Sequence, residues 1–167
     1  MRTRTAAAGS ALFLLLAPGS VTVLVPWLLT GFHARPATGG WVVARVVGAL
    51  LIVVGGSFVV GAFVRFVREG LGTPAPVAPP TRLVVGGVYR YLRNPMYVAV
   101  TAVIVGETLV LGQLVLLVLA AVALAAMVAF VKLYEEPDLA QRFGEEYERY
   151  RRAVPGWWPR LRPWTPQ

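Results

Sequence analysis

Two short segments hold the side chains in this sequence that could do chemistry. The first covers residues 86–97, reads GGVYRYLRNPMY, and places arginines among tyrosines just before an Asn-Pro pair. Asn94 suits a helix N-cap and Pro95 a first helical position, so a helix is predicted to begin here. Helix starts attract anions, and a neighbouring arginine can bind a carboxylate or phosphate through two hydrogen bonds. Arg90 and Arg93 suit that role or, equally, contact with lipid headgroups.

The second segment is the acidic pair Glu135-Glu136, which ends a long apolar stretch. Adjacent carboxylates at such a boundary are unfavourable unless a cation meets them. Arg90, Arg93, Lys132 or the ammonium group of a ligand could be that cation, and a solvated helix end is the simpler alternative. Together the two segments predict a ligand with both a carboxylate and an ammonium, to which tyrosine faces would attract a further positive centre.

Other kinds of site are excluded by residue type. The chain has no cysteine, which excludes disulfides, cysteine zinc sites and thiol nucleophiles. Its one histidine, His33, cannot form a histidine metal cluster, so no metal is predicted. The net charge of +8 lies between apolar runs, which favours membrane topology and anionic lipid over nucleic acid as its explanation.

Composition predicts the elements that position these segments. With 57% hydrophobic and 14% charged residues, the chain is too apolar for a soluble domain of 167 residues. A spanning helix needs about 20 apolar residues, and backbone within lipid must bond to itself. We therefore expect an all-α, polytopic membrane protein forming one domain over 1–167, with about four transmembrane helices. They are expected at residues 6–32, 42–66, 96–111 and 113–134.

The positions of the charges predict the topology. All 16 Lys and Arg residues except Arg35 and Arg45 lie on one side of the predicted spans. The positive-inside rule then places both termini and the middle loop in the cytoplasm, with the protein in the plasma (inner) membrane. A cleaved signal peptide is the alternative for the first stretch. A tight hairpin at Gly112 would return the chain to the cytoplasmic face. Within the third stretch, Glu107 is an intramembrane carboxylate and hence a functional candidate. The simpler expectation is that it reaches water at the far surface near Gly112, and Arg45 is its candidate partner.

The region after the fourth stretch differs in character. Apolar positions recur there at helical spacing, which predicts an amphipathic cytoplasmic helix. These positions are Leu139, Phe143, Tyr147 and Tyr150. Three tryptophans then follow among prolines, and such residues are typical of anchoring at lipid headgroups. They are Trp157, Trp158 and Trp164.

The order and spacing of these motifs resemble a known family. Residues 87–97, the hairpin, the Glu135-Glu136 pair, the run 143–147 and the later Val154-Pro155 resemble isoprenylcysteine carboxyl methyltransferases and phospholipid methyltransferase-like enzymes. The resemblance covers roughly half of the chain. It implies a small helical membrane enzyme that binds S-adenosylmethionine at the cytoplasmic face and methylates a lipophilic acceptor from the bilayer.

The resemblance also implies roles for individual residues within the cofactor regions 74–97 and 134–158. The residues that it implies for cofactor binding are Thr81, Arg82, Leu83, Val84, Tyr89, Asn94, Pro95, Met96, Tyr97 and Glu135. The candidate catalytic residues are Arg93, Glu135 and Glu136.

Two departures from the family leave the acceptor open. Asn94 stands where the well-known form has histidine, and an amide cannot act as a base. Val131 stands where the eukaryotic enzyme has an arginine for the substrate carboxylate. The acceptor could be isoprenoid-, carboxylate- or phospholipid-like. An NADPH-dependent membrane reductase is an alternative, although no Gly-x-Gly-x-x-Gly is present, and a non-catalytic membrane scaffold is another. The sequence predicts no oligomeric state.

Overall fold

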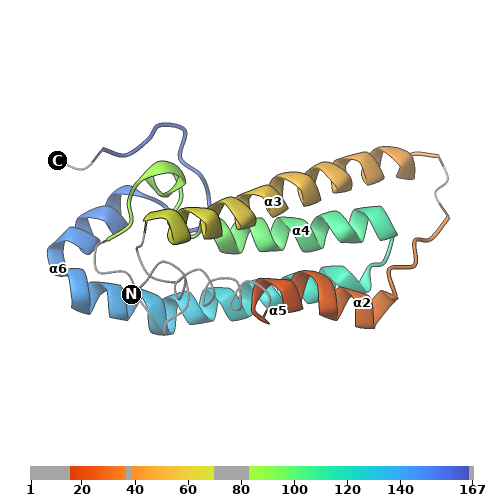
Figure 1. The fold of residues 1–167 in the computed structure, drawn as a ribbon, viewed down its shortest axis with the longest axis horizontal. Coiled ribbons are helices and arrows are strands. Elements are labelled where there is room, and N and C mark those ends of the chain that lie inside the picture. Colours follow the sequence, from red (N-terminus) through yellow and green to blue (C-terminus); the bar gives the residue numbers. More distant parts are fainter. Residues whose placement is uncertain (1–15, 37–38, 70–82, 166–167) are drawn as a thin grey trace.

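The computed structural model describes residues 16–36, 39–69 and 83–165, and within them all regular structure is helical. This confirms the all-α prediction for those ranges. The elements in order are the π-helical turn η1 (Ser20–Leu24), α2 (Val25–Thr30), α3 (Trp41–Glu69), the 3-10 turn η2 (Gly87–Arg90), α4 (Pro95–Leu111), α5 (Val115–Phe130), the π-helical turn η3 (Val131–Glu135) and α6 (Glu136–Ala153). The long helices run side by side, and α6 lies at one end (Figure 1).

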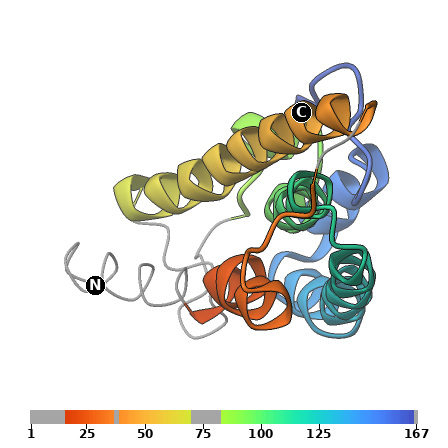
Figure 2. The same ribbon diagram turned by 90° about the vertical axis from the view of Figure 1, so that its right-hand side faces the viewer.

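Helices α3 and α4 are antiparallel and approach so closely that glycine is required between them. A Cβ atom on Gly48 would lie 2.6 Å from the carbonyl oxygen of Gly106, and the reverse distance is also 2.6 Å. One heptad further along α3, a Cβ on Gly55 would lie 2.8 Å from the carbonyl oxygen of Ala99. Small residues permit this approach in lipid, where van der Waals packing rather than the hydrophobic effect joins helices. Figure 2 shows α3 crossing over α4.

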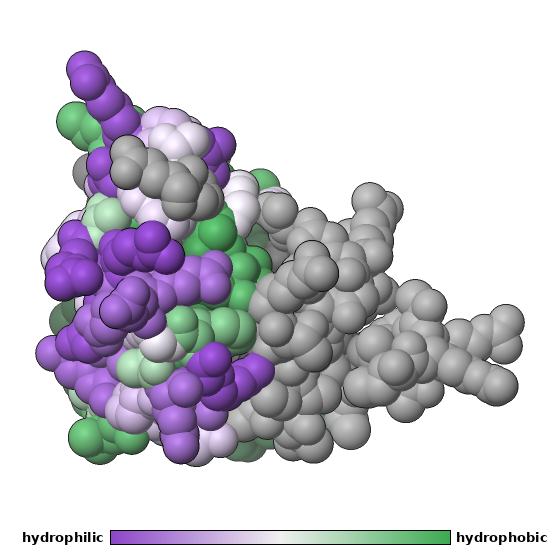
Figure 3. Space-filling model, turned by 90° about the vertical axis from the view of Figure 1, so that its left-hand side faces the viewer, coloured by the Kyte–Doolittle hydropathy of each residue, from purple (hydrophilic) through white to green (hydrophobic). Residues whose placement is uncertain are grey.

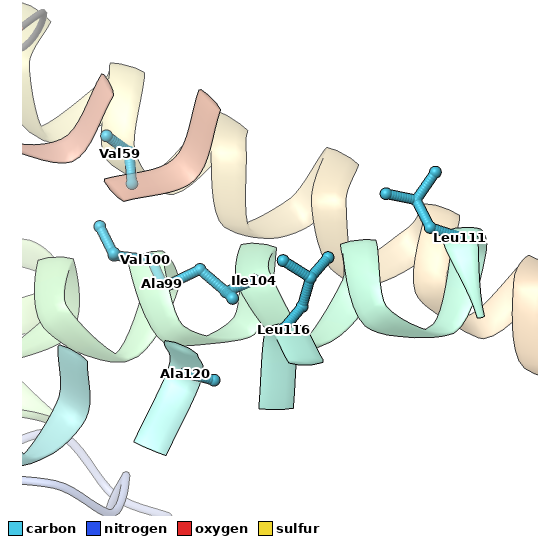
Figure 4. Close-up of a cluster of buried hydrophobic side chains, with 7 residues drawn as sticks. All are labelled: Val59, Ala99, Val100, Ile104, Leu111, Leu116 and Ala120. Atoms are coloured by element: carbon cyan, nitrogen blue, oxygen red, sulfur yellow. The ribbon is translucent and has the colours of Figure 1, made fainter. Parts of the chain in front are cut away.

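The hairpin between α4 and α5 turns at Gly112, as the sequence predicted. Gly112 has φ +68°, a left-handed conformation that suits glycine, and its N–H donates to the Thr108 carbonyl at 2.8 Å. Ile104 and Leu116 are fully buried between the two helices. Figure 4 shows the apolar cluster around them, which draws on α3, α4 and α5.

Two helical segments are long and apolar enough to cross a membrane. They are Trp41–Gly61 in α3 and the continuous run Val115–Ala153, whereas Ser20–Thr30 and α4 are shorter apolar helices. By length and apolar composition, the described residues therefore support two of the roughly four predicted spans. The predicted span 6–32 lies partly outside the described residues. Apolar side chains face outward along these helices, with Leu50 at 59% and Val118 at 63% exposure.

The expected pairing of Glu107 with Arg45 is wrong. Among the described residues, Glu107 Oε2 and Arg45 Nε are both buried without a hydrogen-bond partner, and no ion pair joins them. Arg45 Nη2 donates instead to the carbonyl oxygen of Arg35. That carbonyl lies in the loop after α2, where Arg35 N–H also donates to Leu111 O at 2.9 Å. The arginine therefore ties this loop to α3.

The chain changes helical geometry twice as it leaves α5. Pro137 has no N–H to donate to the carbonyl of residue 133, and the preceding turn, η3, is widened to π geometry. Further on, Gly144 adopts φ +51° and ψ −126°, which bends α6. The predicted apolar face of this region still packs together, but across a bend rather than along one straight helix. Leu139, Phe143, Tyr147, Tyr150 and Val154 belong to one cluster with Leu83 and Trp164.

Candidate functional site

The site lies at the end of the molecule where α4 begins and α6 begins. There the C-terminal segment, residues 155–164, runs along the turn of residues 86–94 that precedes α4 (Figure 1). Four backbone hydrogen bonds join the two: Arg93 N to Pro155 O at 3.0 Å, Asn94 N to Gly156 O at 3.2 Å, Arg160 N to Tyr91 O at 3.0 Å, and Trp164 N to Arg90 O at 2.9 Å. The turn is therefore held by a segment more than 60 residues later in the chain.

Arg93 joins this turn to α6 and to the C-terminal segment. Its Nη1 donates to Glu136 Oε1 at 2.8 Å and to the Tyr147 hydroxyl at 3.2 Å, and its Nε donates to Val154 O at 2.9 Å. The Arg93 and Glu136 side chains are each 14% exposed, whereas Arg151, at 3.7 Å from the other Glu136 oxygen, is 45% exposed. Glu136 thus has the cationic partner that the sequence required, and much of the Arg93 guanidinium is occupied by the protein itself.

Glu135 has a different environment from its neighbour. The Tyr97 hydroxyl donates to Glu135 Oε1 at 2.5 Å, and among the described residues no Lys or Arg forms an ion pair with this carboxylate. Burial raises the pKa of Glu135, the adjacent Glu136 charge raises it further, and the Tyr97 hydrogen bond opposes the rise. A cation placed here would therefore be stabilised. The ring of Trp157 lies 6.3 Å from the ring of Tyr97, centroid to centroid.

Asn94 is the N-cap residue of α4, and Pro95 is its first residue, as predicted, but the Asn94 side chain makes no capping bond. Its Nδ2 is buried and has no hydrogen-bond partner within the part of the chain that the structure describes. A Cβ atom on Gly156 would lie 3.3 Å from Nδ2 and 3.2 Å from Arg93 Nη2. An unpaired buried donor is costly, so this amide is suited to a ligand acceptor.

The sequence matches the phospholipid methyltransferase family over residues 43–146, more than half of the chain. The chain belongs to this family. The matched region contains Arg93, Asn94, Tyr97 and the Glu135-Glu136 pair, whereas the C-terminal segment follows it. Family membership together with the apolar helices indicates a membrane protein of the phospholipid methyltransferase family.

A curated relative supports the same assignment. The chain is 36% identical over 73 residues to the protein-S-isoprenylcysteine O-methyltransferase of Schizosaccharomyces pombe. The alignment covers 44% of this chain and 31% of the relative, so it spans less than a third of that protein. No solved structure matches this family member.

The other predicted site residues of this methyltransferase-family protein have different surroundings. Met96 packs against the apolar cluster of α3–α5, and Leu83 packs against the Tyr147–Tyr150 cluster. The carbonyl oxygen of Tyr89 accepts a hydrogen bond from the Tyr150 hydroxyl at 2.7 Å. Val84 is partly buried beside Leu83. Thr81 and Arg82 lie outside the described residues.

Three contacts in this family member were missed by sequence reasoning. Tyr147 was predicted only as part of an apolar face, yet its hydroxyl accepts from Arg93. Gly156 and Trp157 lie within the predicted cofactor region 134–158, but their contacts with Asn94 and Tyr97 were not predicted. The three C-terminal tryptophans, all predicted to contact headgroups, have different surroundings. Trp158 is 80% exposed, whereas Trp157 lies against Tyr97 and Trp164 against Tyr150. The only signal in the sequence for these contacts was the run of glycine and tryptophan directly after an apolar helix face.

Proposed function

We propose that this protein is an S-adenosylmethionine-dependent methyltransferase that acts on a lipophilic acceptor at the membrane surface. The observation that carries the proposal is the hydrogen bond between Tyr97 and Glu135, which lie 38 positions apart and within the region matched to the family. It joins the start of α4 to the end of η3, and Glu135 directly precedes Glu136 of the partly buried Arg93–Glu136 pair.

The residues present fit the chemistry of that cofactor. Glu135 is a carboxylate without a cationic partner among the described residues, which suits the ammonium group of the methionine moiety. The unpaired Asn94 Nδ2 is a hydrogen-bond donor and suits the carboxylate of the methionine moiety. The aromatic faces of Tyr97 and Trp157 suit a sulfonium, because cations are attracted to aromatic rings. When bound, the cofactor supplies an electrophilic methyl group.

The chain's own residues would contribute mainly orientation. The Arg93–Glu136 pair and the backbone bonds to residues 155–156 hold Asn94 in place, and Tyr97 holds the Glu135 carboxylate. For a carboxylate acceptor, positioning and exclusion of water suffice, since no proton must leave. An amine or phenol acceptor would need a base, for which Glu135 and Glu136 are the candidates, and Glu135 can serve only while it is not paired with the ammonium group of the cofactor.

The proposed topology retains about four spans, with both termini and the middle loop in the cytoplasm. Helix α4 has 17 residues and is about 25 Å long at 1.5 Å per residue, a little shorter than a hydrocarbon core of about 30 Å. The site would then lie at the cytoplasmic face of the plasma membrane, where an isoprenoid-, carboxylate- or phospholipid-like acceptor can enter from the bilayer.

Calorimetric titration of the purified, nanodisc-reconstituted protein with S-adenosylmethionine tests this proposal. Binding is expected, and Glu135→Gln is expected to weaken it at least tenfold, because one charge-assisted contact contributes about 1.5–3 kcal/mol. Glu145→Gln is the matched control, since Glu145 is exposed on α6 and forms no ion pair among the described residues. Failure to bind would favour the non-catalytic scaffold. Lipids from cells with and without the gene, compared for the mass of an added methylene, would then identify the acceptor.

A further inference from the structure

The C-terminal segment presents two large apolar side chains to the outside. Trp158 is 80% exposed and Leu161 is 99% exposed, the latter the most exposed large hydrophobic residue among those described. Their neighbours point the other way, with Trp157 against Tyr97 and Trp164 against Tyr150 at 5.4 Å between ring centroids. The segment therefore has an inner face and an outer face, and the outer face is apolar.

The outward direction of these side chains is set by the backbone. Arg160 N–H donates to Tyr91 O, and Trp164 N–H donates to Arg90 O, so both ends of residues 160–164 are bound to the turn before α4. Two arginine side chains add to this: Arg90 Nε donates to Trp164 O at 2.6 Å, and Arg160 Nη1 donates to Ala153 O at 2.7 Å. Leu161 is exposed within a segment that the fold holds in place.

The charge around this outer face has one sign. After Glu148 the sequence contains no acidic residue through Gln167, but it contains five arginines. Of these, Arg152 and Arg162 are exposed and form no ion pair among the described residues, whereas Arg151 is paired with Glu148 and Glu136. Figure 3 shows hydrophilic residues gathered on this end of the molecule, with apolar residues between them.

We propose that the outer face of residues 158–162, with Arg152, binds the anionic headgroups of the bilayer that holds the apolar helices. Trp158 and Leu161 enter the boundary between headgroups and acyl chains, as Trp does at membrane interfaces, while Arg152 and Arg162 meet lipid phosphates. The mixture of Trp, Leu and unpaired Arg matches an interface that is apolar on one side and anionic on the other. This inference concerns membrane contact and does not rest on methyl transfer.

The absence of cysteine from the sequence allows a direct measurement of depth. A single cysteine introduced as Leu161→Cys in the full chain carries a nitroxide, and the protein is reconstituted in nanodiscs of phosphatidylcholine with or without phosphatidylglycerol. Collision with oxygen, which enters lipid, is compared with collision with an aqueous nickel chelate. In anionic discs the label at 161 is expected to collide more often with oxygen than with the nickel chelate. A control label at Glu145→Cys on α6 is expected to collide more often with the nickel chelate.

The arginines are tested by adding Arg152→Gln and Arg162→Gln to the labelled protein. Each substitution is expected to lower the ratio of oxygen to nickel collision rates at the label in anionic discs by about fivefold, since each basic residue near an anionic surface contributes favourably, with little change in phosphatidylcholine. Three results would overturn the proposal: water exposure at 161 equal to that at 145, immersion that does not depend on anionic lipid, or shielding from both reagents with dipolar broadening between labelled copies. The last would mean that a second copy covers this face. None of these readouts depends on methyltransferase activity.

Discussion

Removal of the Arg93 guanidinium should destabilise the end of the molecule that contains the candidate site and so lower the free energy of unfolding. In Arg93→Gln, Glu136 keeps its charge at 14% exposure, and its remaining cation is the half-exposed Arg151 at 3.7 Å. An exposed ion pair contributes about 0–1 kcal/mol, so Arg151 cannot compensate. Breaking a buried pair on one side costs about 3–5 kcal/mol, and the slight exposure of both partners favours the lower end. With the lost bond to Val154 O, worth about 1 kcal/mol, the expected loss of unfolding free energy is about 3–4 kcal/mol.

The assay is equilibrium unfolding of the detergent-solubilised protein, followed by tryptophan fluorescence, since Trp157 and Trp164 belong to the affected region. Arg142→Gln is the control, because its ion pair with Asp138 at 3.1 Å has side chains 28% and 41% exposed, and it should cost less than about 1 kcal/mol. The double variant Arg93→Gln with Glu136→Gln should recover about 2 kcal/mol relative to the sum of the single variants. A loss in Arg93→Gln no larger than in the control, or strict additivity in the double variant, would refute the reasoning.

Three further outcomes follow from the same structure. Gly106→Ala should destabilise the α3–α4 pair by about 1–3 kcal/mol in thermal unfolding through overpacking, whereas Gly56→Ala, with open space around its Cβ, should be neutral or slightly stabilising. Burial raises the pKa of Tyr147 and Tyr150, so the folded state favours the protonated phenols; stability should be complete below pH about 10 and decline as pH rises above it. Ultraviolet phenolate titration beside unfolding measurements checks this, and a decline beginning near neutral pH would contradict it. Asn94→Ala should weaken S-adenosylmethionine binding about tenfold without loss of stability, since its amide has no partner to lose; a destabilised protein with unchanged affinity would reverse the assignment.

Much of the architecture could be predicted because it depends on local rules. The helical nature of the apolar stretches follows from the need to satisfy backbone hydrogen bonds in lipid. The start of α4 at Pro95 and the turn at Gly112 follow from the conformations that proline and glycine favour. A hairpin of two helices necessarily returns its ends to the same side, which is why the regions around Asn94 and Glu135 could be expected together.

The contacts within the site could not be predicted in the same way. The residue pattern alone does not distinguish Glu135 from Glu136, and only the family resemblance assigns Glu135 to the cofactor. In the structure the π turn before Pro137 and the packing of α6 give them different partners, Tyr97 and Arg93. The residue pattern also treated Trp157 and Trp158 alike, yet backbone pairing with the turn before α4 places one inward and the other outward.

Composition and local pattern thus determined that this chain is a helical membrane protein and which of its segments are candidates for chemistry, because lipid solubility and turn geometry are properties of short stretches. Only the tertiary structure decided which carboxylate is neutralised and which stays available, and which amide is buried without a partner. Those outcomes depend on side chains more than 35 residues apart meeting at one end of the bundle, and no local pattern specifies the partner across such a separation.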